Sequence, residues 1–158
     1  MADYFTNFSL VMDLPDEAAQ TYALNLAQQA ADMQFADDPP ELPADFPESL
    51  VRVLEIWNFE TEVQGSLEQG KYGVWLHSFN GGIDAVCEFN RHLLRKNDLA
   101  DTVSFEWSND CSKPRDDAYG GGAAIITARK IKSMNTAEWL QKQIAARERQ
   151  HQLKGGKR

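Results

Sequence analysis

The stretch Phe59-Glu-Thr-Glu-Val-Gln64, followed after a short turn by Tyr72-Gly-Val-Trp-Leu-His77, decides the fold of this chain. In the first run, apolar or small side chains alternate with polar ones, and this period of two is typical of a half-buried strand. Residues 65–70 begin and end with glycine and predict a turn, so the two runs form a hairpin. An antiparallel pair of strands is therefore expected in the middle of the chain.

Helical spacing lies on both sides of this hairpin. After Asn80-Gly-Gly82, apolar residues recur at helical intervals from Ile83 to about residue 95. Upstream, a proline that fits the first helical position and an apolar stripe predict a helix over 15–34. The same kind of spacing predicts a second helix over 47–57. Alternation over 5–14 predicts a strand before both helices.

The last third of the chain continues the pattern. A strand is predicted over 103–107, a polar loop over 109–122 and a strand over 123–128 that lacks alternation and is expected to be buried on both faces. A final helix is predicted from Asn135, which with the acid three residues later resembles a capping box. The tryptophans fall in apolar patterns and are expected in the core: Trp57, Trp75, Trp107 and Trp139.

The predicted order is β-α-α-β-β-α-β-β-α. Hairpin-linked strands flanked by helices indicate an α+β fold, with an antiparallel sheet of about five strands and helices packed on one face. The β-α-β-β-α-β part matches a ferredoxin-like arrangement, although other α+β orders stay open. One domain is expected over 1–146, followed by a basic tail over 147–158 that is expected to fray.

Charge is distributed very unevenly along the 158 residues. The net charge is −8, but residues 1–70 hold fourteen acids and one base, whereas residues 129–158 hold nine bases and two acids. Two cysteines are too few for a disulfide framework or a structural zinc site. The first residues lack the basic start of a signal peptide, and no apolar run has the length of a membrane span. We therefore expect a cytoplasmic protein with reduced thiols.

The segment 35–47 contains four of the six prolines and is predicted to be an extended acidic connector. Spaced carboxylates on a stiff segment resemble a phosphate backbone in sign, so they are candidates for binding a basic groove that normally takes nucleic acid. The alternative is an ordinary solvated acidic surface. The candidate residues are Asp37, Asp38, Glu41, Asp45 and Glu48.

The predicted loop 109–122 is the other candidate site, because loops of this length are often functional. Cys111 lies in it near two cations that would favour a thiolate, but no base is placed beside it, so a plain thiol is the preferred interpretation. Its glycines lead into a strand and not into a helix, which argues against phosphate binding. The candidate interaction residues are Lys113, Arg115, Asp116, Asp117 and Tyr119.

No metal site and no cofactor are predicted. The acids of the 109–122 loop lack the spacing of a calcium loop. His77 lies on one strand face with Trp75, and no second ligand has metal-binding spacing with it, so a packed or surface histidine is expected.

Two stretches carry a resemblance: Tyr4-Phe-Thr-Asn-Phe-Ser-Leu-Val-Met-Asp-Leu-Pro-Asp16, and Ser104-Phe-Glu-Trp-Ser-Asn-Asp-Cys-Ser-Lys-Pro-Arg115, which runs into Tyr119-Gly-Gly-Gly-Ala. The chain resembles small uncharacterised accessory proteins of proteobacterial phages, prophages and plasmids over most of residues 4–140. The resemblance implies a protein of a mobile element, attaches no named activity and transfers no functional residue.

Three hypotheses for the function follow. The first is a non-enzymatic protein that binds a host protein, for example in a nucleic-acid-handling or defence complex, and inhibits or modulates it; CRISPR and restriction antagonists belong to this class. The acidic half would not bind duplex DNA directly, because the charges repel. The second is a small enzyme with its site in the 109–122 loop. The third is an oligomeric structural or regulatory protein.

Overall fold

The structure is a computed structural model that describes residues 2–38, 41–63, 71–113, 115 and 118–155. It contains one antiparallel sheet and four α-helices, so the α+β class is confirmed. In chain order the elements are β1 (Tyr4–Leu14), α1 (Glu17–Phe35), α2 (Glu48–Val51), the 3-10 helix η1 (Leu54–Ile56), β2 (Glu60–Val63), β3 (Tyr72–Ser78), α3 (Ile83–Lys96), β4 (Val103–Cys111), β5 (Gly120–Ile126), β6 (Ile131–Asn135) and α4 (Thr136–Gly155).

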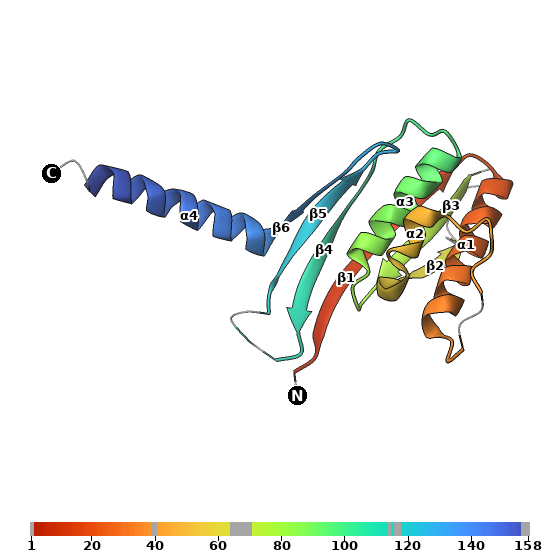
Figure 1. Cartoon of the computed structure of the whole chain (residues 1–158), viewed down its shortest axis with the longest axis horizontal. Coiled ribbons are helices and arrows are strands. Elements are labelled where there is room, and N and C mark those ends of the chain that lie inside the picture. The colour runs from red at the N-terminus through yellow and green to blue at the C-terminus, as the bar shows by residue number, and fades with distance from the viewer. Residues whose placement is uncertain (1, 39–40, 64–70, 114, 116–117, 156–158) are drawn as a thin grey trace.

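The six strands lie in the order β2-β3-β1-β4-β5-β6, and every neighbouring pair is antiparallel. Figure 1 shows the two ends of this sheet, with β2 on the side of α1 and β6 on the side of α4. Both helical crossovers skip one strand. The connection from β1 to β2 passes through α1, and β3 lies between those two strands; the connection from β3 to β4 passes through α3, and β1 lies between them.

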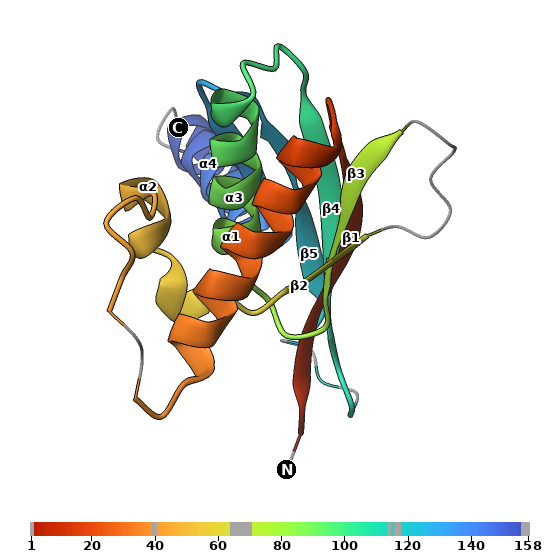
Figure 2. The ribbon, with the colours of Figure 1, turned by 90° about the vertical axis from the view of Figure 1, so that its right-hand side faces the viewer.

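Helices α1, α2 and α3 lie on the same side of the sheet, as Figure 2 shows. The alternating residues Phe8, Leu10, Met12 and Leu14 of β1 are buried beneath them, while the residues between are more exposed. Trp57 joins this core with its ring centroid 4.6 Å from that of Phe59. Burial of these large apolar side chains between one sheet face and its helices is the main force that holds the layers together.

The predicted strands and helices of the first two-thirds of the chain are confirmed, with two adjustments. Helix α1 begins at Glu17 and not at residue 15, because the Asp16 carboxylate accepts a hydrogen bond from the Ala19 backbone N–H at 2.8 Å and caps the helix. The helix predicted over 47–57 is divided into α2 and η1. Val53 departs from helical geometry (φ −115°, ψ 6°), and both Val53 and Trp57 are buried.

The last third of the chain differs most from prediction. The sheet has six strands and not about five, because β6 was not predicted, and much of the predicted loop 109–122 is strand. β4 extends to Cys111 and β5 begins at Gly120, so the connection shortens to 112–119. The glycines belong to β5 because the Trp107 indole lies across it: a Cβ at Gly122 would be 2.2 Å from the Trp107 ring.

β5 is also buried on one face only. Ile126 is fully buried against the helices, whereas Ile125 is half exposed on the other face. The expectation of burial on both faces is therefore wrong, because all the helices that pack on the sheet in the described part of the chain lie on one side of it.

Helix α4 leaves the sheet at the β6 edge and extends away from it (Figure 1). Its first residue anchors it, since the Thr136 hydroxyl accepts a hydrogen bond from the Gly121 N–H at 3.0 Å. The expectation that Trp139 is a core residue is wrong, because its side chain is 51% exposed. The predicted tail is helical from 147 to 155; residues 156–158 lie outside the described residues, and fraying stays a prediction.

Candidate functional site

The sheet face opposite the helices carries no helix in the part of the chain that the structure describes (Figure 2). Residues directly opposite each other in an antiparallel pair point to the same face, so the register assigns the side chains of this open face. Val11 pairs with Trp75, and Ser9 pairs with His77, so all four lie on it. The edge strand β2 adds Glu60 opposite His77, and Glu62 opposite Trp75.

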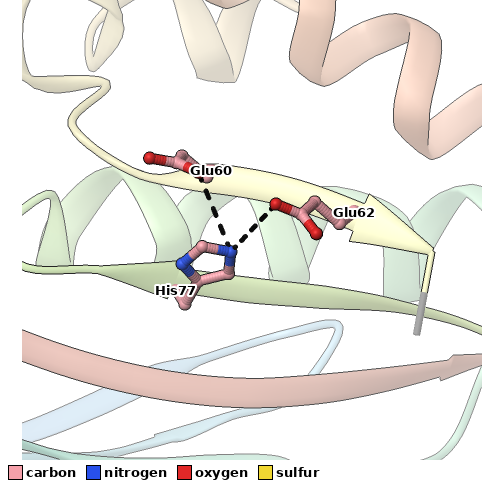
Figure 3. A group of neighbouring side chains, drawn as sticks. All are labelled: Glu60, Glu62 and His77. Atoms are coloured by element: carbon pink, nitrogen blue, oxygen red, sulfur yellow. Dashed lines mark ion pairs between the residues drawn. The ribbon is translucent and has the colours of Figure 1, made fainter. Parts of the chain in front are cut away.

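The β2 end of the open face brings together a histidine and two carboxylates, shown in Figure 3. His77 Nε2 lies 3.5 Å from Glu62 Oε1 and 4.0 Å from Glu60 Oε2. The histidine side chain is only 15% exposed, whereas the glutamates are 74% and 52% exposed. A half-buried imidazole is therefore flanked by two exposed carboxylates of the edge strand.

Neighbouring side chains hold this imidazole in place. The rings of Trp75 and His77 are stacked, with centroids 4.0 Å apart and planes 31° apart. The Trp75 indole N–H donates a hydrogen bond to the Ser9 hydroxyl at 2.8 Å, which ties the stack to β1. Nε2 of His77 is sealed from water and has no hydrogen-bond partner among the described groups. Since a buried polar nitrogen without a partner is costly, this atom needs an explanation.

One ligand atom from each of Glu60, Glu62 and His77 lies within 4.8 Å of the other two, so the three side chains form a set that can hold a cation. The second and third ligands could not be predicted from spacing along one segment, because they lie on a different strand from His77. The hairpin contained this information. Glu60 and Glu62 share one face of the first strand, and the register places His77 on the same face, directly across from Glu60.

The acidic connector lies apart from this cluster. Asp37, Asp38, Glu41, Asp45 and Glu48 are all exposed. Residues 39–40 between them lie outside the described residues. One of the five, Asp45, affects the domain electrostatically. The pKa of the Tyr22 hydroxyl is raised mainly by burial of Tyr22 and further by the negative charge of Asp45.

The connection 112–119 holds the other predicted site residues. Lys113, Arg115 and Tyr119 are exposed, and the Arg115 guanidinium lies 5.9 Å from the centre of the Tyr4 ring. Asp116 and Asp117 lie outside the described residues. The structure therefore gathers three of the five loop candidates on one exposed turn beside the start of β1.

The two thiols differ in their surroundings. Cys87 is buried in α3, and burial, with smaller contributions from Asp84 and Glu88, raises the pKa of its thiol to about 12. Such a thiol is almost entirely protonated at neutral pH and is a poor nucleophile. Cys111, at the end of β4, is half-buried.

A cavity of about 500 Å³ lies on the helix side of the molecule. Four cations line it, Arg52, Arg91, Arg129 and Lys130, together with Asp84 and Glu88. Arg91 is already paired with Glu88 at 2.5 Å, and Asp84 lies in the first turn of α3. Because acids and bases are interleaved around this cavity, its lining is suited to a mixed polar contact more than to a single anion.

Helix α4 is the second exposed feature that sequence reasoning missed. Four large apolar side chains on it are exposed: Trp139 (51%), Leu140 (52%), Ile144 (57%) and Leu153 (75%). Single exposed apolar residues are normal, but several on one projecting helix indicate a contact surface. The sequence predicted a helix here with Trp139 in the core, and only the tertiary structure shows that this side chain is half exposed.

No family model, curated protein or solved structure matches this chain. Among the described residues, the helices are all too short or too polar to cross a bilayer.

Proposed function

We propose that this chain is a non-enzymatic binding protein that acts by contact with another protein, and that helix α4 is its docking element. The observation that carries the proposal is the projection of α4 from the β6 edge with Trp139, Leu140 and Ile144 each more than half exposed. Tryptophan is enriched among the residues that dominate binding energy in protein interfaces.

The composition of α4 suggests what kind of surface it contacts. Its large apolar residues gather mainly in the first half, and the second half carries Arg147 and Arg149. A helix that exposes apolar side chains along part of its length binds by placing them in a groove. Within α4 four bases outnumber two acids, so the complementary groove is apolar at its floor and acidic at its rim.

The resemblance to mobile-element proteins supports a host protein as the partner, and inhibition or modulation of a host complex as the effect. The acidic connector supplies a second contact in this proposal, since its exposed carboxylates suit a basic groove. We also propose that the first four strands belong to a ferredoxin-like fold: their order, β2-β3-β1-β4, with each helical crossover skipping one strand, supports that relationship.

The docking role of α4 can be tested with a triple variant, Trp139→Ala, Leu140→Ala and Ile144→Ala. Tagged wild-type chain is used to capture proteins from a proteobacterial lysate, and the captured protein is then purified and its affinity for the chain is measured. The triple variant should bind at least tenfold more weakly, since interface anchors contribute about 2 kcal/mol or more each. A double variant at exposed polar positions on the other side of the same helix, Gln141→Ala and Gln152→Ala, is the matched control and should bind as the wild type does.

Other outcomes would contradict the proposal in different ways. A triple variant that binds its partner as tightly as the wild type removes α4 from the interface. If the wild type captures only copies of itself, and the triple variant is monomeric by sedimentation, α4 is an oligomerisation helix and the host-partner proposal is wrong.

A further inference from the structure

We propose that Glu60, Glu62 and His77 form a binding site for a divalent transition-metal ion, with Zn²⁺ as the best fit. This inference goes beyond the proposed function and does not depend on it, because the cluster lies at the β2 edge of the sheet, whereas α4 leaves from the β6 edge.

The distances suit a shared ion better than direct hydrogen bonds. In a tetrahedral zinc site with bonds of 2.0–2.2 Å, neighbouring ligand atoms are about 3.4 Å apart. His77 Nε2 lies 3.5 Å from Glu62 Oε1 and 4.0 Å from Glu60 Oε2. Both separations are long for an N–H···O hydrogen bond. Both glutamates are more than half exposed, so their side chains are free to close around an ion.

The state of His77 is the second, independent observation. Its Nε2 has no contact with water and no hydrogen-bond partner among the described groups, and it faces the two carboxylates (Figure 3). A bound cation would accept the lone pair of this nitrogen and neutralise both carboxylates at once. One ion would therefore satisfy a buried nitrogen that the described side chains do not satisfy.

Neighbouring side chains fix the orientation of the His77 ring in the absence of an ion. The imidazole is stacked on Trp75, whose indole N–H is bonded to Ser9. The register of β2 and β3 sets both glutamates opposite this stack. A preformed ring orientation of this kind supports metal affinity, because less freedom is lost on binding. Three protein ligands leave a fourth position for water in a tetrahedral site.

The donor set decides the class of metal. Ca²⁺ and Mg²⁺ prefer six or more oxygen ligands, and an imidazole nitrogen at the buried corner of the site does not suit them. One imidazole with two carboxylates is a set that Zn²⁺ and neighbouring transition metals accept. The absence of cysteine from the cluster predicts purely nitrogen and oxygen coordination.

The test uses the full chain after dialysis against a chelator. Calorimetric titration with Zn²⁺ should show one ion bound per chain, and Co²⁺ should give visible absorption bands without the thiolate charge-transfer bands that cysteine ligands produce. His77→Ala should weaken Zn²⁺ binding about tenfold or more, because it removes one of three protein ligands. Zn²⁺ should also raise the melting temperature of the wild type, since the ion links β2 to β3, but not that of His77→Ala.

A second variant separates the loss of a metal ligand from a loss of folding, because only 15% of the His77 side chain is exposed. Glu62→Gln changes an exposed side chain and should also weaken binding, whereas Glu148→Gln, at an exposed position of α4 beyond the opposite edge of the sheet, should bind Zn²⁺ as the wild type does. The proposal is overturned if the wild type shows no saturable binding. It is also overturned if Glu62→Gln and His77→Ala both bind as the wild type does, which would place any bound ion elsewhere on the chain.

Discussion

His92 is half-buried on α3 and is in polar contact with Tyr22 of α1. The Tyr22 hydroxyl oxygen lies 2.8 Å from His92 Nε2, and the Lys96 ammonium lies 5.0 Å from the centre of the Tyr22 ring. Burial lowers the pKa of His92 below its usual value of 6.5, and the nearby cations Lys96 and Arg95 lower it further. The folded state therefore favours the neutral imidazole, which keeps the contact between the two helices free of a third positive charge.

This environment predicts a pH dependence of stability. Above about pH 6.5 the imidazole is neutral in both states and its contribution to stability is complete. As the pH falls below 6.5, the unfolded chain takes up the proton before the folded one, so the free energy of unfolding should decrease until the lowered folded-state pKa is passed. Urea unfolding between pH 8 and pH 5 should show a shallower decrease for His92→Gln than for the wild type. His151→Gln, on the exposed α4, should follow the wild type; equal slopes for all three proteins would contradict the prediction.

At the scale of elements, the connector between α1 and α2 joins two helices that pack on the core and carries four exposed carboxylates, with a fifth, Glu48, at the start of α2. Phe46 is half-buried against the core, so the segment is held at its end near α2 while its acids face solvent. Prolines restrict the backbone of such a segment and keep its charges apart. This arrangement is what the hypothesis of a basic partner groove requires, and it leaves the charges dispensable for folding.

The connector hypothesis predicts that neutralising Asp37, Asp38, Glu41, Asp45 and Glu48 to Asn or Gln weakens binding to the purified partner and slows association. Wild-type binding should fall steeply between about 50 and 200 mM salt, as charge-driven association does. The melting temperature should not fall, because exposed substitutions change stability by about 0.5 kcal/mol or less each.

A control variant for this experiment removes the same number of exposed charges outside the connector. It neutralises Asp13, Asp32, Glu55, Asp101 and Glu106. If this control and the connector variant lose affinity equally, net charge alone matters, and the connector has no specific role.

At the scale of the whole molecule, the core and α4 are energetically separate. The buried cluster and the residues packed against it end at Ile131, so the described core includes no residue of α4. β6 is different, because it covers the edge of β5 and brings Ile131 against the core. The sheet therefore depends on β6, whereas α4 is an attachment held by its first turn.

This division predicts the result of truncation. A chain that ends after Leu140 should lose helical circular dichroism but keep its free energy of unfolding within about 1 kcal/mol, because it loses only exposed side chains. The truncated chain should also no longer bind the partner protein of the full-length chain. A chain that ends after Lys130 is the contrasting control; it removes β6, exposes the β5 edge and should unfold at much lower denaturant concentration. If both truncations are equally destabilising, α4 is an integral part of the fold.

Much of the secondary structure could be predicted from local patterns in the sequence alone. The α+β class, β1, α1, the β2–β3 hairpin and α3 were predictable because each buries one face, and one-sided burial leaves a period of two or 3.6 in the residues. The exposure of the acidic connector was predictable for the same reason, since prolines and charges have no place in a core.

Tertiary structure alone decided the features that depend on partners far away in the chain. The sequence predicted a loop at Gly120–Gly122, but the Trp107 ring requires glycine in the strand beside it. Trp139 has the same apolar spacing whether a sheet covers it or not, so its exposure could not be predicted. Glu60, Glu62 and His77 become neighbours only through the register of two strands. Register is set by how the whole sheet buries one face beneath α1 and α3, and a segment taken by itself does not contain that information.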